Sequence, residues 1–391
     1  MARVTMAVFA IASLAAEAAV ADDGGPPTAE PTAPPVAEPL LPPVTESAPE
    51  ASSEPVPLRW IDRVTLSGGV DGYVALPLRG GLREPSALRA FDAVNGSFTL
   101  AYAELAVAVA PAPAGLRLDL GFGPVADLSS LEVTTDPGPP PTTTTGASEV
   151  MKHVQQAYVS LELPGPRSVV VDAGRFVTSA GAEVIEAKDD WLYSRSLLFG
   201  YAIPFAHNGV RITAAMSARL SLQAMLVNGW DVAADPNDAK TIGASVLYAR
   251  SPTGLAAAVN VLAGKETAAV RVLVDIVIGT RATRGLAWNL NLDAGRDGDA
   301  AWYGASAMVR HVGRRVTLVA RVEHFEDPGG VRTGVAGGTA ISETTAGIAI
   351  PIGGAAEVRL EGRVDQAAAT LFAGGTESTQ ATVTAAALAW F

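Results

Sequence analysis

The sequence predicts an all-β fold, an antiparallel β-barrel of about 16 strands that spans a membrane. Apolar and polar residues alternate in repeated runs of roughly 10 residues, the pattern typical of membrane-crossing strands. Beyond the N-terminal segment, no uncharged apolar stretch reaches the length of about 18 residues that a transmembrane helix needs. The chain also ends within one of the alternating runs, at Phe391.

The C-terminal run shows this alternation clearly. One face carries Ala381, Val383, Ala385, Ala387, Ala389 and Phe391. A strand in hydrocarbon cannot leave its N–H and C=O groups unpaired, so strands that cross a membrane must close into a barrel. A chain that ends inside a strand on an aromatic residue is typical of bacterial outer-membrane barrels.

Other runs assign the faces of the barrel wall. Val358, Leu360 and Val364 alternate with charged residues, and Val316, Leu318, Ala320 and Val322 alternate with Thr317, Arg321 and Glu323. An apolar outer face with a charged inner face is the pattern of a transmembrane barrel. A soluble β-sandwich could also bury the apolar face.

We count 16 such runs between Val64 and Phe391. They cover 64–78, 97–110, 115–126, 153–163, 168–176, 207–216, 219–228, 241–250, 255–263, 270–279, 285–294, 300–311, 315–325, 342–352, 355–366 and 378–391. Short, turn-rich connections alternate with longer or more polar ones, as periplasmic turns alternate with external loops. An even strand number predicts that both termini lie in the periplasm, and one misread hairpin would give 14 or 18 strands.

Two segments precede the barrel. Residues 1–21 have a basic start, an apolar core and a small-residue cleavage site, which together predict a secretory signal peptide. Residues 22–57 carry seven acidic residues, no Lys or Arg and much Pro and Ala, so we expect a disordered periplasmic tether. Residues 58–391 form the predicted barrel. The absence of cysteine excludes disulfides, Cys-based metal sites and a lipid-modified cysteine anchor.

The net charge of the barrel segment is small for its length. The chain carries a net charge of −12, of which the tether accounts for −7 and the signal peptide for none, so residues 58–391 carry −5. Such a segment does not indicate a nucleic-acid partner.

Short sequence blocks in the middle of the chain, between residues 153 and 231, resemble the OmpL-like β-barrel porin family. The blocks are residues 153–159 (HVQQAYV), residues 172–178 (DAGRFVT) followed by Gly181 and Glu183, residues 194–196 (SRS), Pro204, residues 208–210 (NGV) and residues 227–231 (VNGWD). This resemblance implies a bacterial outer-membrane porin, whose pore passes small hydrophilic solutes or ions by passive diffusion.

The resemblance gives the inward charges a function. A barrel of about 16 strands leaves room for water, whereas about eight strands would fill with side chains. The predicted pore-lining residues are Asp71, Glu104, Arg117, Asp119, Arg211, Arg271, Asp275, Arg321, Glu323, Glu357, Arg359, Glu361, Arg363 and Asp365. Their arrangement would set ion selectivity. For the set at 357–365, a cross-strand salt-bridge ladder that stiffens the wall is an equal alternative.

The third external loop, residues 177–206, is the candidate constriction. Its charged residues include Glu183, Glu186, Lys188, Asp189, Asp190 and Arg195. The resemblance implies that this loop folds into the lumen. A loop with charges of both signs could instead lie in solvent.

No catalytic motif stands out, and we expect neither an enzyme nor a cofactor or metal. The four histidines lack metal-ligand spacing, and no G-x-S-x-G motif is present. We interpret residues 121–124 (GFGP) as part of a strand rather than a phosphate-binding strand-to-helix turn. A Ser and a His within hydrogen-bonding reach on the outer wall or rim would favour an outer-membrane hydrolase instead.

The expected partners are outer-membrane lipid and small hydrophilic solutes. A homotrimer and a contact of the tether with the cell wall stay open. The alternative function is a non-conducting barrel that serves as an adhesin, a receptor or an envelope anchor.

Overall fold

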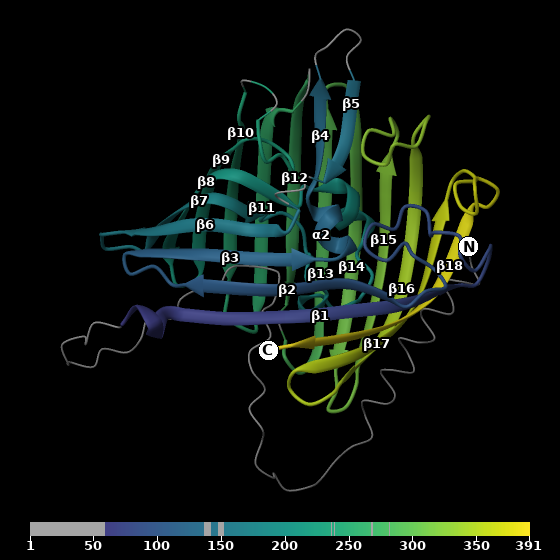
Figure 1. The fold of residues 1–391 in the computed structure, drawn as a ribbon, viewed down its shortest axis with the longest axis horizontal. Coiled ribbons are helices and arrows are strands. Elements are labelled where there is room, and N and C mark those ends of the chain that lie inside the picture. The colour runs from purple at the N-terminus through teal and green to yellow at the C-terminus, as the bar shows by residue number, and fades with distance from the viewer. Residues whose placement is uncertain are drawn as a thin grey trace, which may run out of the picture. The chain divides into compact units, whose positions relative to one another are not determined.

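The computed structural model describes residues 59–136, 142–147, 152–235, 237, 239–266, 269–280 and 282–391. The predicted signal peptide and tether lie outside these residues. Sixteen strands form one closed antiparallel barrel, in the order β1-β18-β17-β16-β15-β14-β13-β12-β11-β10-β9-β8-β7-β6-β3-β2. Figure 1 shows the first and last strands, purple and yellow, side by side where the barrel closes. Within the described ranges, no helix is long and apolar enough to cross a membrane.

The barrel strands match all sixteen predicted runs, with ends that differ by at most four residues. They are β1 (Val64–Pro77), β2 (Thr99–Val109), β3 (Ala114–Phe122), β6 (Val154–Leu163), β7 (Val169–Val177), β8 (Ala206–Ser217), β9 (Leu220–Val227), β10 (Thr241–Ala249), β11 (Leu255–Lys265), β12 (Val270–Thr280), β13 (Gly285–Asp297), β14 (Ala300–Val312), β15 (Thr317–Asp327), β16 (Thr339–Pro351), β17 (Ala356–Ala367) and β18 (Thr379–Trp390). The predicted transmembrane barrel is confirmed.

The largest difference lies at the end of β3. The run predicted to reach residue 126 stops at Phe122, and the short helix α2 (Pro124–Ser129) follows. Gly123 has a φ of 106°, which glycine adopts easily, and Pro124 occupies the first helical position, where its missing N–H is not needed. The interpretation of residues 121–124 as continuous strand was therefore wrong: they form a strand-to-helix turn.

A second difference is the hairpin of β4 (Leu131–Asp136) and β5 (Thr142–Ala147), which forms a separate two-stranded sheet. The alternation pattern placed these residues in a loop. Residues 142–145 are four consecutive threonines, which favour strands because they are β-branched. They show no apolar alternation, so a period of two in the sequence does not mark them as a strand.

The register divides the wall into two faces, because residues directly opposite in antiparallel strands point to the same side. On β17, Val358, Leu360 and Val364 are 37%, 50% and 38% exposed, whereas Arg359 and Arg363 between them are 4% and 2% exposed. The neighbouring strands repeat this phase. The apolar residues therefore face outward and the charged residues inward.

This arrangement predicts that charge on the outer face is costly. Leu360→Arg, near the middle of β17, should destabilise the barrel by about 2–4 kcal/mol in a bilayer. Leu286→Arg, one residue from the start of β13, is the matched control and should cost about 0–1 kcal/mol. Urea titrations of both variants folded in lipid vesicles measure the difference, and equal costs would contradict the assigned membrane depth.

Candidate functional site

The segment between β7 and β8, residues 178–205, lies against the inner face of the barrel wall; we refer to it as the internal loop. It contains the short helical turns η2 (Ala187–Asp189) and η3 (Leu198–Ala202). Its polar contacts with the wall are spread over several strands. Ser179 contacts Ser245 on β10, Ala182 contacts Asn291 on β13, and Leu197 contacts Glu323 on β15. Tyr193 contacts Glu361 on β17 and Asp71 on β1, and Lys188 contacts Glu104 on β2. The loop thus contacts a continuous arc of the wall from β10 to β2.

Wall carboxylates accept hydrogen bonds from the backbone of this loop. Glu361 binds the amides of Tyr193 and Ser194, the latter at 3.0 Å. Glu323 binds the amides of Leu197 and Leu198 at 2.6 and 3.3 Å. An irregular buried segment leaves many N–H groups without partners, and these two carboxylates supply partners for four of them.

Wall guanidinium groups do the same for the carbonyl groups of the internal loop. Arg359 donates to the carbonyl oxygens of Ala187 and Leu192, at 2.8 and 3.1 Å. Arg321 donates to the carbonyl of Ser194 at 2.8 Å, and Arg363 donates to that of Arg195 at 2.7 Å. The charged wall therefore takes the place of regular secondary structure for this segment.

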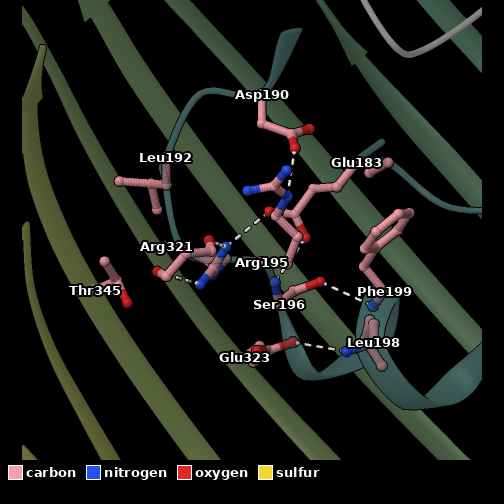
Figure 2. A network of polar contacts seen from close by, with 12 residues as sticks. Glu183, Asp190, Leu192, Arg195, Ser196, Leu198, Phe199, Arg321, Glu323 and Thr345 are labelled. Carbon is pink, nitrogen blue, oxygen red and sulfur yellow. Dashed lines mark hydrogen bonds and ion pairs between the residues drawn. The ribbon is translucent and has the colours of Figure 1, made fainter. Parts of the chain in front are cut away.

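Ion pairs balance these buried charges. Arg321 lies between Glu343 on β16, at 2.9 Å, and Glu183 of the loop, at 2.8 Å. Within the loop, Arg195 pairs with Asp190 at 3.0 Å. Figure 2 shows Arg321 on the wall pointing toward the loop that carries Glu183 and Arg195. A buried charge is tolerated only when it is paired and hydrogen-bonded, and the charges of this group meet that condition.

Small wall residues leave room for apolar side chains of the loop. A Cβ atom at Gly304 would lie 2.5 Å from a methyl group of Leu198, and one at Gly347 would lie 2.7 Å from a methyl group of Leu192. Farther along the loop, the carbonyl of Ala202 accepts a 3.0 Å hydrogen bond from the indole of Trp302. The loop is thus fitted to the wall by shape as well as by charge.

The structure places all fourteen predicted inward residues on the inner face, but in different surroundings. Asp71, Asp275, Arg321, Glu323, Arg359, Glu361, Arg363 and Asp365 are buried. The side chains of Arg117, Glu357, Arg211 and Arg271 are more exposed, at 38%, 19%, 15% and 14%, and those of Glu104 and Asp119 are 7% and 2% exposed. In the set at 357–365, Arg359 pairs with Glu357 and Arg363 with Asp365 along β17, at 2.5 and 2.8 Å, and Arg363 lies 3.8 Å from Glu343 on β16.

The loop contacts one arc of the inner wall through its first residue, since Thr178 is hydrogen-bonded to His207 on β8 at 3.3 Å. Among the described residues, 179–203 make no hydrogen bond or ion pair to the inner faces of β3, β6, β7, β8 or β9. Arg117 pairs with Asp119 at 2.8 Å, and Arg211 pairs with Asp172 at 2.8 Å. Arg211 also lies over the ring of Tyr158, 5.6 Å from its centroid. We refer to β3 and β6–β9 as the open arc.

Of the six charged loop residues singled out from the sequence, Glu183 and Lys188 contact the wall directly by ion pairs, Glu183 to Arg321 and Lys188 to Glu104, each at 2.8 Å. Lys188 also pairs with Asp189 at 2.9 Å. Burial lowers the pKa of Lys188, but the nearby carboxylates of Asp189, Glu186 and Glu104 outweigh that effect and raise it above its ordinary value. Lys188 therefore stays charged at neutral pH.

Comparison with known proteins identifies the family. The family model described as "Putative beta-barrel porin-2, OmpL-like" matches residues 63–391. The chain belongs to this family. The resemblance seen in the sequence blocks is confirmed, and with it the bacterial outer membrane as the location and pore formation as the general function. No curated protein matches the sequence.

Solved structures show the same fold at low sequence identity. Vibrio cholerae OmpT in its trimer form is 10% identical, with a TM-score of 0.52 over 84% of this chain and 99% of that one. Salmonella typhi OmpF in complex with daunomycin is 10% identical, with a TM-score of 0.52 over 84% and 97%. The anion-selective porin from Comamonas acidovorans is 13% identical, with a TM-score of 0.50 over 84% and 99%. At these identities the similarity concerns the fold of the porin alone.

Several residues of the site gave no signal in the sequence. Trp302, Phe325 and Leu388 face inward and belong to one buried apolar cluster with Leu198 and Phe199 of the loop. The alternation of β14, β15 and β18 gives their side of the wall. Alternation alone does not indicate whether an inward apolar side chain is covered by the loop or exposed to water.

The wall contacts predict that Arg321 is the residue on which loop placement depends most. Arg321→Met should destabilise the porin by about 3–5 kcal/mol, because Glu183 and Glu343 would lose their buried partner. Hydrogen exchange should rise in residues 183–198. Arg314→Met, in the exposed turn after β14, is the matched control, and equal exchange in both variants would contradict the anchoring role.

Proposed function

We propose that this porin passes small hydrophilic solutes or ions by diffusion between the internal loop and the open arc. One observation carries the proposal: the loop is bound to the wall from β10 to β2, whereas, among the described residues, 179–203 make no hydrogen bond or ion pair to the inner faces of β3 and β6–β9. The side chain of Arg117 on that arc is 38% exposed, which supports it. The alternative is a non-conducting barrel that serves as an adhesin, receptor or envelope anchor.

We further propose that the internal loop is the constriction. Lys188 lies beside β2, since it pairs with Glu104 at 2.8 Å, and it also pairs with its neighbour Asp189 at 2.9 Å. Carboxylates on the loop would then face guanidinium groups on the wall. A passage with opposite charges on its two sides selects ions by the balance between them.

Diffusion needs no catalysis inside the barrel, and we assign no cofactor or metal to the lumen. A homotrimer is the assembly that we propose, by analogy with the trimer form of the similar Vibrio cholerae protein. Light scattering of the detergent-solubilised protein tests the assembly directly. A contact of residues 22–57 with the cell wall stays a prediction outside the described residues.

Shortening the internal loop should widen the passage. Deletion of residues 184–198 should raise single-channel conductance in planar bilayers, since it removes the segment that contacts β13 to β2. Deletion of the β4–β5 hairpin, residues 131–147, is the length control and should leave conductance near that of the unaltered protein. If removal of 184–198 changed nothing in a correctly folded barrel, the loop would not be the constriction.

Charge changes on the two sides should shift ion selectivity in opposite directions. Arg117→Gln removes a positive charge and should move the reversal potential in a KCl gradient toward the K⁺ value. Asp189→Asn should move it toward the Cl⁻ value. Arg314→Gln, outside the barrel wall, should have the smaller effect. Silence from a folded protein would favour the non-conducting alternative, and identical reversal potentials in all variants would exclude these residues from the passage.

A further inference from the structure

A hydrogen-bonded row of polar side chains lies on the outer face of the barrel, away from the lumen. Tyr303 on β14 is directly opposite Glu326 on β15, and His324 on β15 is directly opposite Ser342 on β16. His324 and Glu326 are two residues apart on one strand, so they share a face. That face is the outer one, because Val322 in the same phase is 45% exposed.

The four groups form a continuous chain of hydrogen bonds. The Oγ of Ser342 lies 2.9 Å from Nδ1 of His324, and Nε2 of His324 lies 3.1 Å from a carboxylate oxygen of Glu326. The hydroxyl of Tyr303 donates to the other carboxylate oxygen at 2.7 Å. A carboxylate only accepts, so the neutral imidazole donates through Nε2 and keeps Nδ1 free to accept from the serine hydroxyl.

This order is that of a nucleophile, a general base and an orienting carboxylate. Hydrolases are recognised by such geometry rather than by sequence position, and the three residues come here from two neighbouring strands. A Ser and a His in contact on the outer wall are the arrangement expected of an outer-membrane hydrolase.

We propose that Ser342, His324 and Glu326 form an esterase site for the acyl ester of a lipid in the surrounding leaflet. The site lies near the end of the wall, since β15 ends at Asp327 and a loop of eleven residues, 328–338, follows. Ester groups of membrane lipids occupy the same boundary between hydrocarbon and water. The side chains of His324 and Glu326 are 50% and 33% exposed, so a substrate can reach them from the membrane side.

The proposed reaction has two steps. The Oγ of Ser342 attacks the ester carbonyl carbon while Nδ1 of His324 takes its proton, and the C–O bond to the alcohol breaks as His324 returns that proton to the leaving oxygen. Water then attacks the acyl-serine with His324 again as base, which releases the fatty acid and restores the serine hydroxyl. Glu326 and Tyr303 are positioning residues, because they hold the imidazole in the tautomer that both steps need.

The developing negative charge on the carbonyl oxygen needs a donor. Backbone N–H groups in the middle of paired strands are already bonded, so that donor must be a side chain. Gln366 on β17 is directly opposite Ser342, exposed, and on the same outer face. Side chains opposite each other in this way lie about 5 Å apart at Cβ, which lets the amide of Gln366 reach an oxygen bound at Ser342.

The test uses the full-length protein folded in detergent micelles, with p-nitrophenyl octanoate as substrate and a fluorophosphonate as covalent probe. We expect ester hydrolysis and labelling of Ser342, identified by mass spectrometry of the peptide. Ser342→Ala should abolish labelling at this position. His324→Gln should lower hydrolysis by about 100-fold or more. Glu326→Gln should lower it and move its pH profile, and Glu326→Asp should recover part of the loss, which a merely structural carboxylate would not do.

His311→Gln is the matched control, since His311 also lies on the outer face, near the opposite end of β14. It should hydrolyse the ester at the rate of the unaltered protein. Single-channel conductance should be the same in all these variants, which shows that each barrel is folded. Hydrolysis that persists in Ser342→Ala, or absence of both hydrolysis and labelling in a conducting protein, would overturn the proposal and leave the row as a polar band at the membrane surface.

Discussion

Every buried backbone N–H and C=O group needs a partner, and in a membrane water cannot supply it. The sixteen wall strands meet this constraint by pairing with one another in a closed ring. The internal loop, residues 178–205, cannot meet it in the same way, because it has little regular structure. Its amides and carbonyls are instead bonded by charged side chains of the wall, among them Glu323, Arg359 and Glu361. The charged inner face and the inserted loop therefore require each other.

The wall could be predicted from the sequence because a strand has a period of two and a membrane enforces it on every strand. On β17, the residue types of Leu360 and Arg359 already indicate which side chain points outward and which points inward, and the structure agrees. The failures occurred where a local conformation, rather than alternation, decides the structure. Gly123 ends β3 through its positive φ, and the threonines of β5 form a strand outside the barrel sheet in a stretch of sequence without apolar alternation.

The site was less accessible to sequence reasoning. Alternation shows that Arg321 points inward, but its burial depends on the loop that covers it, and Glu183 lies 138 residues earlier in the chain. The outer row is a similar case. His324 and Glu326 are visibly two residues apart, whereas the contact with Ser342 depends on the register between β15 and β16. Contacts of this kind depend on the register between neighbouring strands, and the alternation of residues along one strand does not reveal that register.

The position of the internal loop has a consequence for how the ring is closed. The last strand, β18, pairs with β1, and this is where the two ends of the sheet meet. The loop bonds to both sides of that junction, through Tyr193 to Asp71 on β1 and through Ser194 to Glu361 on β17. It therefore acts as an internal clamp across the seam. Because the segment is held inside by residues from both ends of the sheet, its hydrogen bonds add to the strand pairing between β1 and β18 that keeps the ring closed.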